Sequence, residues 1–297
     1  MPSMKAIKRR RLTVKNISQI TKAMNLVATS KLQKARAALA AISGSAFATF
    51  DIVYNTVSHP DVQEHPLLQQ REKIKKTAYV VITGDRGLCG GYNSNVCKEF
   101  IKHAKEHGKD GIVIPVGTKG RDYLSRRGYD VMSYDDSLSD LLVQMYTTGE
   151  VDEIYIAYTK FVTVLNLEPI VRKVLPIDPA YLRLVLNDNL GKKERWEDLG
   201  FFPRPEERVA TNAEMEFEPS LEQVLQSAMP LYLSMFLRAA LASGELCEHA
   251  ARMTSMDSST KNASDIIEKL TLQFNRQRQS IITQEITEIV SGANALQ

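Results

Sequence analysis

Residues 82–91 form the stretch whose composition most directly suggests chemistry. Their sequence, ITGDRGLCGG, follows a strand-like run and precedes a helix-like one, as phosphate-binding loops do. The stretch lacks both G-x-G-x-x-G and the lysine of G-x-x-x-x-G-K-S/T. A nucleotide site is one interpretation. The favoured one is a tight turn whose glycines let the loop approach a neighbouring surface.

A second candidate is the pattern H-x-x-E-H formed by His103, Glu106 and His107. In zinc-dependent peptidases this spacing places two imidazoles on one helical face. Here the pattern lies in the last turn before Gly108, where histidine commonly complements the helix dipole. We favour the dipole role and predict no metal, cofactor or catalytic residue.

The cysteines Cys89, Cys97 and Cys247 are spaced neither as a zinc site nor as a redox C-x-x-C pair. We expect buried, reduced thiols. Their odd number fits a reducing compartment better than secretion.

The middle of the chain alternates strand-like and helix-like runs. The strand-like runs are residues 78–83, 112–116, 131–134, 154–161 and 181–186, and the helix-like runs are 93–107, 119–127 and 138–145. Such alternation predicts a small Rossmann-like α/β domain with a mainly parallel sheet.

Both ends of the chain have the spacing of very long helices. Residues 3–59 contain no proline and one glycine, and their apolar residues recur at Ile7, Val14, Ile17, Ile20, Met24, Val27, Leu39 and Ile42. No proline follows Pro230, and the apolar positions there are Ile267, Leu270, Phe274, Ile281, Ile282, Ile286 and Ile289. Each helix would be about 85–90 Å long, whereas a compact globule of this length has a radius of gyration of about 19 Å. At least one end of each helix is therefore expected to protrude.

A long helix needs packing for its apolar stripe, and the other helix is the obvious partner. Apolar spacings of three, four and seven predict a left-handed coiled coil, antiparallel because the middle domain returns the chain to its base. The alternative is a helical bundle with breaks at Gly44, Pro230 and Gly244.

Charge is distributed unevenly along the chain. Residues 1–50 hold ten Lys and Arg and no acid, so with a net charge of +3 the remainder carries −7. This basic start suggests a nucleic-acid arm, a mitochondrial-type presequence or a helix that meets an acidic protein surface. No aromatic residue precedes Phe47 to stack on bases, which disfavours nucleic acid. No unbroken apolar run approaches the ~20 residues that cross a bilayer, so membrane association is expected only through a partner.

Three stretches together resemble the gamma subunit family of F-type ATP synthases. They are IKRRRLTVKNISQITKAMNLVATSKLQKA at 7–35, ITGDRGLCGGYNSNV at 82–96, and EHAARMTSMDSSTKNASDIIEKLTLQFNRQRQSIITQEITEIVSGANAL at 248–296. The first begins where mature family members begin, so no presequence is expected. Residues 191–219 contain no cysteine, which resembles bacterial members.

The resemblance implies a non-catalytic central-stalk rotor subunit without a cofactor. It would couple ion-driven rotation of the c ring to conformational changes in the catalytic β subunits. The implied partners are the α and β subunits, the ε subunit and the c ring, with no nucleic acid. The implied location is peripheral, on the cytoplasmic face of the bacterial cell membrane.

By motif position, the resemblance also implies residue roles. Arg86, Arg278 and Gln279 would grip β, while Lys22 and Met24 would pass its acidic loop. A small, apolar tip would turn as a bearing or, alternatively, be a frayed chain end; its residues are Ile289, Val290, Gly292, Ala293, Ala295 and Leu296.

The expected segments are a shaft helix (1–59), a linker (60–75), an α/β foot (76–190), a second linker (191–218) and a second shaft helix (219–297), with a kink at Pro230. Two other functions stay open. One is a nucleotide-binding α/β enzyme that uses residues 82–91, and the other is a nucleic-acid-binding coiled-coil protein that uses the basic helix.

Overall fold

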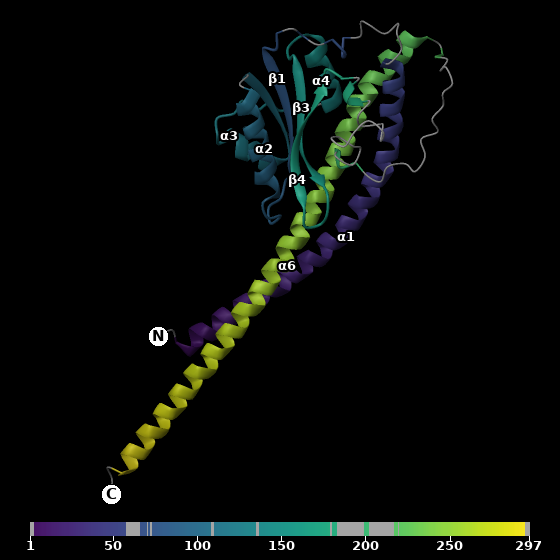
Figure 1. The fold of residues 1–297 in the computed structure, drawn as a ribbon. Helices are drawn as coiled ribbons and strands as arrows, with labels where there is room; N and C mark the ends of the chain where they lie inside the picture. Colours follow the sequence, from purple (N-terminus) through teal and green to yellow (C-terminus); the bar gives the residue numbers. More distant parts are fainter. Residues whose placement is uncertain are drawn as a thin grey trace. The chain divides into compact units, whose positions relative to one another are not determined.

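A computed structural model of the chain describes residues 3–57, 66–69, 71, 73–107, 110–134, 137–178, 180–182, 199–201, 217–218 and 220–294. The chain divides into two compact units. Unit 1 comprises residues 1–29 and 252–297, and unit 2 comprises residues 30–251. Two helices, α1 (Met4–Val57) and α6 (Leu221–Asn294), contribute to both units (Figure 1). The five-segment division expected from the sequence stays a prediction.

The two terminal helices are continuous. The first has 54 residues and the second 74, which correspond to about 80 and 110 Å at the α-helical rise. Gly44, Pro230 and Gly244 all lie inside helix. The alternative in which these residues break the ends into a bundle of short hairpins is therefore wrong.

Both helices contain stretches that could cross a membrane by length and composition alone, with mean hydropathy of 1.4 and 1.3. These stretches were not indicated by the sequence, because neither is an unbroken run of apolar residues. In unit 2, however, apolar residues of both helices fill the core, where the Phe50 ring lies 4.6 Å from that of Tyr232 and 6.1 Å from that of Phe236. Packing inside a folded unit therefore accounts for part of this apolar content.

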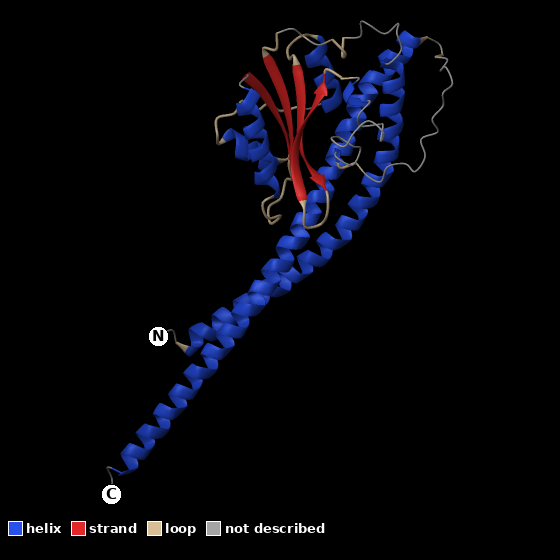
Figure 2. Cartoon of the chain, viewed as in Figure 1, coloured by secondary structure: helices blue, strands red, loops and turns tan. Residues whose placement is uncertain are grey.

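Unit 2 contains a four-stranded sheet with the order β2-β1-β3-β4 (Figure 2). Strands β1 (Lys76–Ile82), β2 (Asp110–Val116) and β3 (Glu153–Phe161) are parallel, and β4 (Leu167–Leu175) is antiparallel to β3. The shorter helices are α2 (Tyr92–His107), α3 (Thr118–Ser125) and α4 (Leu138–Thr147). The predicted mainly parallel sheet is confirmed.

Alternation along the central strands supplies side chains to both faces of the sheet. Val80 and Ile156 pack with residues of α1, α4 and α6. Tyr79, Val81 and Tyr155 pack with α2 and α3 on the other face. Helices therefore cover both faces, as parallel strands require.

Two expected strands are wrong. Of residues 131–134, only Val131 pairs, through an isolated bridge to Val113. The next donor along β2 would be Pro115, which has no N–H, so the ladder stops. Tyr181 and Leu182 are helical instead of extended, and residues 183–186 lie outside the described part of the chain.

Strand β4 was missed from the sequence. Pro169 lies inside it and Pro176 follows it, and proline argues against a central strand. The strand lies at the edge of the sheet, where proline is tolerated.

Candidate partner-binding surface

The two helices of unit 1 pack antiparallel. The hydroxyl oxygens of Thr21 and Thr260 are 2.7 Å apart, and the Asn25 amide donates to the Met253 carbonyl at 2.9 Å. Nearer the chain ends, the Arg11 guanidinium lies 5.5 Å from the centre of the Phe274 ring. As the residue number increases along α1, the number of the contacting residue on α6 decreases. This confirms the predicted antiparallel pair.

Buried positions in this pair recur every seven residues. On α1 they include Ile7, Thr21 and Ala28, and on α6 they are Met256, Ala263 and Leu270. A repeat of seven is the spacing of a left-handed coiled coil. The small side chains among them allow the two backbones to approach closely.

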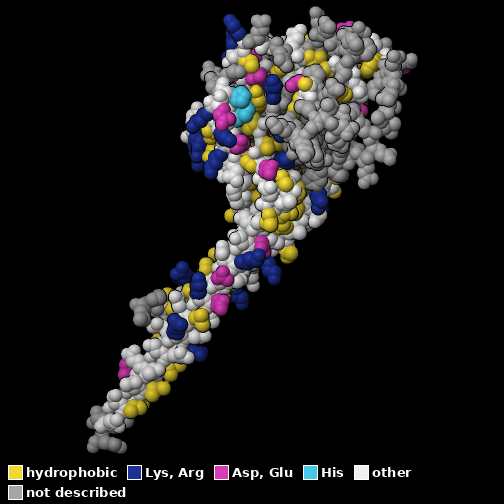
Figure 3. Space-filling view, in the orientation of Figure 1, with side chains coloured by type: hydrophobic (Ala, Val, Ile, Leu, Met, Phe, Trp, Pro, Cys, Tyr) yellow, Lys and Arg dark blue, Asp and Glu magenta, His cyan; other side chains and the backbone are white. Residues whose placement is uncertain are grey.

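Several apolar residues that were expected to pack in the pair are instead exposed. Ile20 is 60% exposed and Val27 is 58% exposed, and Ile17 also faces outward. The physical reason is that each helix buries one narrow stripe against a single partner helix. The remaining apolar residues form an outer surface, which we call the apolar shaft surface (Figure 3); it comprises Leu12, Ile17, Ile20, Leu26, Val27, Ile266, Leu272, Ile282, Ile286, Ile289 and Val290.

The last part of α6 has no opposite segment of α1. Helix α6 continues for 20 residues after Phe274, to Asn294, whereas α1 has only seven residues before Arg11. The difference is about 13 residues, or about 20 Å. Ile289 and Val290 of the expected tip are exposed there. Gly292 and Ala293 belong to α6, while Ala295 and Leu296 lie outside the described residues.

Unit 1 is strongly basic. Its residues include twelve Lys and Arg against five Asp and Glu, a net charge of +7 in a chain whose total is +3. Among the described residues, no carboxylate forms an ion pair with the exposed side chains of Lys8, Arg9 or Lys22. Large apolar and basic surfaces together are typical of a protein interface.

The structure separates the predicted contact residues. Lys22 is exposed and Met24 half-buried, close to the Thr21–Thr260 contact. Arg278 and Gln279 are exposed on α6, and Arg278 lies 18 residues, or about 27 Å of helix, beyond Thr260. Arg86 belongs to unit 2. The predicted contact residues of unit 1 therefore lie in two separate regions along the pair.

The loop 83–91 is held by a side chain from the first turn of α2. The Asn93 amide accepts a hydrogen bond from the Gly84 N–H at 2.8 Å and donates to the Arg86 carbonyl at 3.3 Å. An added Cβ at Gly84 would lie 2.6 Å from Glu248 of α6, so the glycine permits close packing. This loop lies between a strand and a helix, but it packs against a neighbouring helix as the favoured interpretation expected.

The first N–H groups of α3, the helix that follows β2, are occupied by residues of β1's end and of this loop. The Thr118 N–H donates to the Asp85 carboxylate at 2.9 Å, the Lys119 N–H to the Gly84 carbonyl, and the Gly120 N–H to the Thr83 hydroxyl. A carboxylate at this position repels an anion. The start of α3 is therefore not open to an anion.

The loop presents a residue that the sequence did not single out. Leu88 has a φ of 64° and is 62% exposed, which is unusual for a large non-glycine side chain. Beside it, Arg86 is also exposed. A strained, exposed leucine next to an arginine is a candidate contact point for another protein.

His103 and His107 stack on each other, with ring centres 4.0 Å apart, and both rings pack on Tyr155. Burial, followed by the charge of His107, lowers the pKa of His103. Among the described residues, no group of three or more His, Cys, Asp or Glu is placed to hold a metal ion. The pair therefore extends an aromatic cluster on the α2 face of the sheet.

The three cysteines are buried and form no disulfide, as expected. Burial raises the pKa of the Cys97 thiol to about 12 and that of Cys247 further. These thiols are therefore poor nucleophiles in the folded protein.

The fold and surface define a class of protein that works through contact with other proteins, and comparison with known proteins narrows that class. Residues 3–296 match the family model described as ATP synthase. The ATP synthase gamma chain of Desulforamulus reducens is 37% identical over 309 residues, which cover both chains completely. That of Alkaliphilus metalliredigens is 40% identical over 305 residues, which cover 99% of this chain and 98% of the relative. The chain therefore belongs to the ATP synthase gamma chain family.

Solved structures share the fold. One chain from the mitochondrial ATP synthase of Euglena gracilis (OSCP/F1/c-ring) has a TM-score of 0.61 at 16% identity, with 99% of this chain and 94% of that chain covered. A chain from the central stalk and c ring of the Tetrahymena thermophila enzyme has a TM-score of 0.56 at 23% identity, with 80% and 98% covered.

Proposed function

We propose that this chain is the central-stalk rotor subunit of an F-type ATP synthase. It couples ion-driven rotation of the c ring to conformational changes in the catalytic β subunits and catalyses nothing itself. The observation that carries the proposal is the antiparallel pair formed by the chain's own ends, with an apolar shaft surface and a basic surplus facing outward.

A rotor must make different contacts with chemically identical partners, because a ligand shifts a conformational equilibrium only through differential affinity. The helix pair meets this requirement. Its two helices differ in sequence, and α6 continues about 13 residues past the start of α1. Each orientation of the pair would therefore present a different surface to each β subunit.

The contacts with β are assigned to Lys22, Met24, Arg86, Arg278 and Gln279. The basic surplus of α1 steers the pair toward an acidic loop of β. The tip turns in the ring of α and β subunits, where its small apolar residues form few lasting hydrogen bonds. The ε subunit and the c ring bind the α/β part, which holds the chain peripherally on the cytoplasmic face of the bacterial membrane.

The decisive test is co-expression with α, β and ε subunits. We expect co-purification and ATPase activity only in the assembly. ATPase activity or stoichiometric ATP binding by the isolated chain would contradict the proposal.

A sharper test concerns the basic surplus. Replacing Lys8, Arg9, Lys22 and Lys31 by Glu is expected to reduce coupled ATP synthesis several-fold. The matched control exchanges Lys and Arg at the same four positions, keeping the charge, and is expected to retain coupling. Unchanged synthesis in the charge-reversed assembly would refute the steering role.

A further inference from the structure

A hollow of about 600 Å³ lies in unit 2, at the N-terminal ends of the central strands β1 and β3. Its described lining is polar apart from Gly149 and consists of four cations and two acids: Arg71, Lys73, Lys75, Lys76, Glu150 and Asp152. Among these described residues, no aromatic or aliphatic side chain offers apolar contact to a base or an acyl chain.

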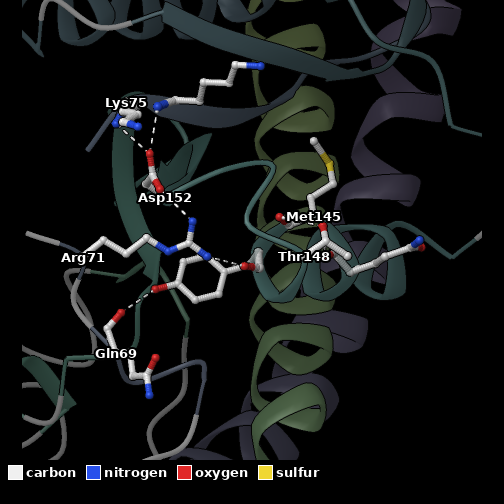
Figure 4. A network of polar contacts seen from close by, with 9 residues as sticks. Gln69, Arg71, Lys75, Met145, Thr148 and Asp152 are labelled. Carbon is white, nitrogen blue, oxygen red and sulfur yellow. Dashed lines mark hydrogen bonds and ion pairs between the residues drawn. The ribbon is translucent and has the colours of Figure 1, made fainter. Parts of the chain in front are cut away.

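Arg71 and Asp152 satisfy each other (Figure 4). The Arg71 guanidinium donates to an Asp152 oxygen at 2.7 Å and to the Tyr146 carbonyl at 2.8 Å. The other Asp152 oxygen accepts from the backbone N–H groups of Lys75 at 2.6 Å and Lys76 at 3.0 Å. The charge of Asp152 is thus matched inside the site by that of Arg71, and two N–H donors of the Arg71 guanidinium are already used.

The three lysines keep their charges for another partner. Lys73, Lys75 and Lys76 are exposed, and in the described part of the chain none of their ammonium groups forms an ion pair. Among the described lining residues, only Glu150 is left to offset them. The hollow therefore carries a surplus of positive charge that an anion would relieve.

The kinds of cation present indicate the kind of anion. Arginine recognises both carboxylate and phosphate through its two-pronged guanidinium, whereas lysine ammonium groups bind phosphate as compact point charges. Since Arg71 is committed and three lysines remain, we propose that this hollow binds a phosphate group. The group belongs either to a free phosphate compound or to the headgroup of an anionic phospholipid.

The test uses the full chain and two probes. Pyrophosphate is titrated by calorimetry, and vesicles of phosphatidylglycerol are compared with vesicles of phosphatidylcholine by co-sedimentation. The variant is Lys73→Gln with Lys75→Gln. The matched control is Lys98→Gln with Lys102→Gln, which removes two exposed lysines from α2. Thermal unfolding of both variants checks that the fold is kept.

We expect the double variant of the hollow to weaken binding of at least one probe tenfold or more, while the control binds as the unaltered chain does. If the double variant binds only pyrophosphate more weakly, the ligand is a free phosphate compound. If the double variant binds phosphatidylglycerol vesicles more weakly, the ligand is a lipid headgroup. The proposal is overturned if neither probe binds, or if the variant and its control behave alike. None of these outcomes depends on the proposed rotor function.

Discussion

The hydroxyl oxygens of Thr21 and Thr260 lie 2.7 Å apart, although 239 positions separate the residues in the sequence. Thr21 is 9% exposed and occupies one of the heptad positions of the helix pair. A polar contact at such a position fixes the register of two helices, because sliding by one turn would leave buried hydroxyls facing apolar groups.

Replacing either threonine by valine is expected to lower the free energy of unfolding by about 1 kcal/mol. The double substitution should cost less than the sum of the two, because neither hydroxyl is then left facing an apolar partner. Chemical denaturation of the four chains measures this coupling. Thr13→Val, at an exposed position of α1, is the control. Strict additivity would show that the contact does not stabilise the pair.

Gly117→Ala is expected to destabilise unit 2 by about 3 kcal/mol or more. Gly117 has a φ of 95°, and an added Cβ would lie 2.3 Å from the Thr83 carbonyl oxygen. Gly128→Ala is the matched control, since Gly128 has a φ of 79° but no atom within 4 Å of an added Cβ. The control should cost about 1–2 kcal/mol from backbone strain alone. Equal losses in urea denaturation would show that the Thr83 contact relaxes freely.

Asp152 should make the free energy of unfolding depend on pH in the acidic range. Burial alone would raise the pKa of Asp152, but hydrogen bonds from the backbone of Lys76 and Lys75 and from Arg71, with the charge of Arg71, hold it below the usual 3.8. Because the folded pKa is the lower one, the stabilisation is complete above the unfolded pKa. It is lost as pH falls through the folded pKa.

Asp152→Asn should therefore remove part of the loss of stability below about pH 4. It should also lower stability at neutral pH, since Arg71 loses its charged partner. Asp140→Asn, on the exposed side of α4, controls for the change in net charge. Denaturation curves between pH 2 and 7 that stay parallel for the unaltered chain and Asp152→Asn would contradict this expectation.

Arg278→Ala with Gln279→Ala is expected to reduce ATP-driven ion pumping by the assembled enzyme several-fold. Both side chains are exposed, so the free energy of unfolding of the isolated chain should change by less than about 0.5 kcal/mol. Arg276→Ala removes an exposed arginine two residues before Arg278 and on another face of α6 from it, and should have a smaller effect. Equal pumping in all three assemblies would remove these residues from the proposed β contact.

Deleting the last ten residues tests the bearing role of the tip. We expect the melting temperature of the whole complex to fall while that of the isolated chain stays the same, because Ile289 and Val290 are exposed in the isolated chain. Ile289→Gln with Val290→Gln keeps the length and removes the apolar contact, so it should give part of the same loss. An unchanged melting temperature of the truncated complex would favour a frayed chain end.

The sequence by itself determined the elements that depend on local periodicity. Continuous helical spacing without proline over residues 3–59 yielded α1, and apolar spacings of three, four and seven, such as those of Ile267, Leu270 and Phe274, yielded a coiled coil. Alternating strand-like and helix-like runs yielded the mainly parallel sheet. These signals are local, because they depend on how successive side chains are directed along one element.

The tertiary structure decided what depends on contacts between distant residues. Ile20 and Thr21 are adjacent, yet the threonine is buried and the isoleucine is exposed, since the partner helix covers only one stripe. The Asp85 carboxylate accepts a hydrogen bond from the Thr118 N–H at the start of α3, 33 residues away in the sequence, and no sequence motif indicated this contact. Pairing with β3 made β4 a strand despite Pro169. The protrusion of the helix pair from the α/β domain stays a prediction. Periodicity determines that a segment is helical, but it does not determine the position of that helix relative to the rest of the chain.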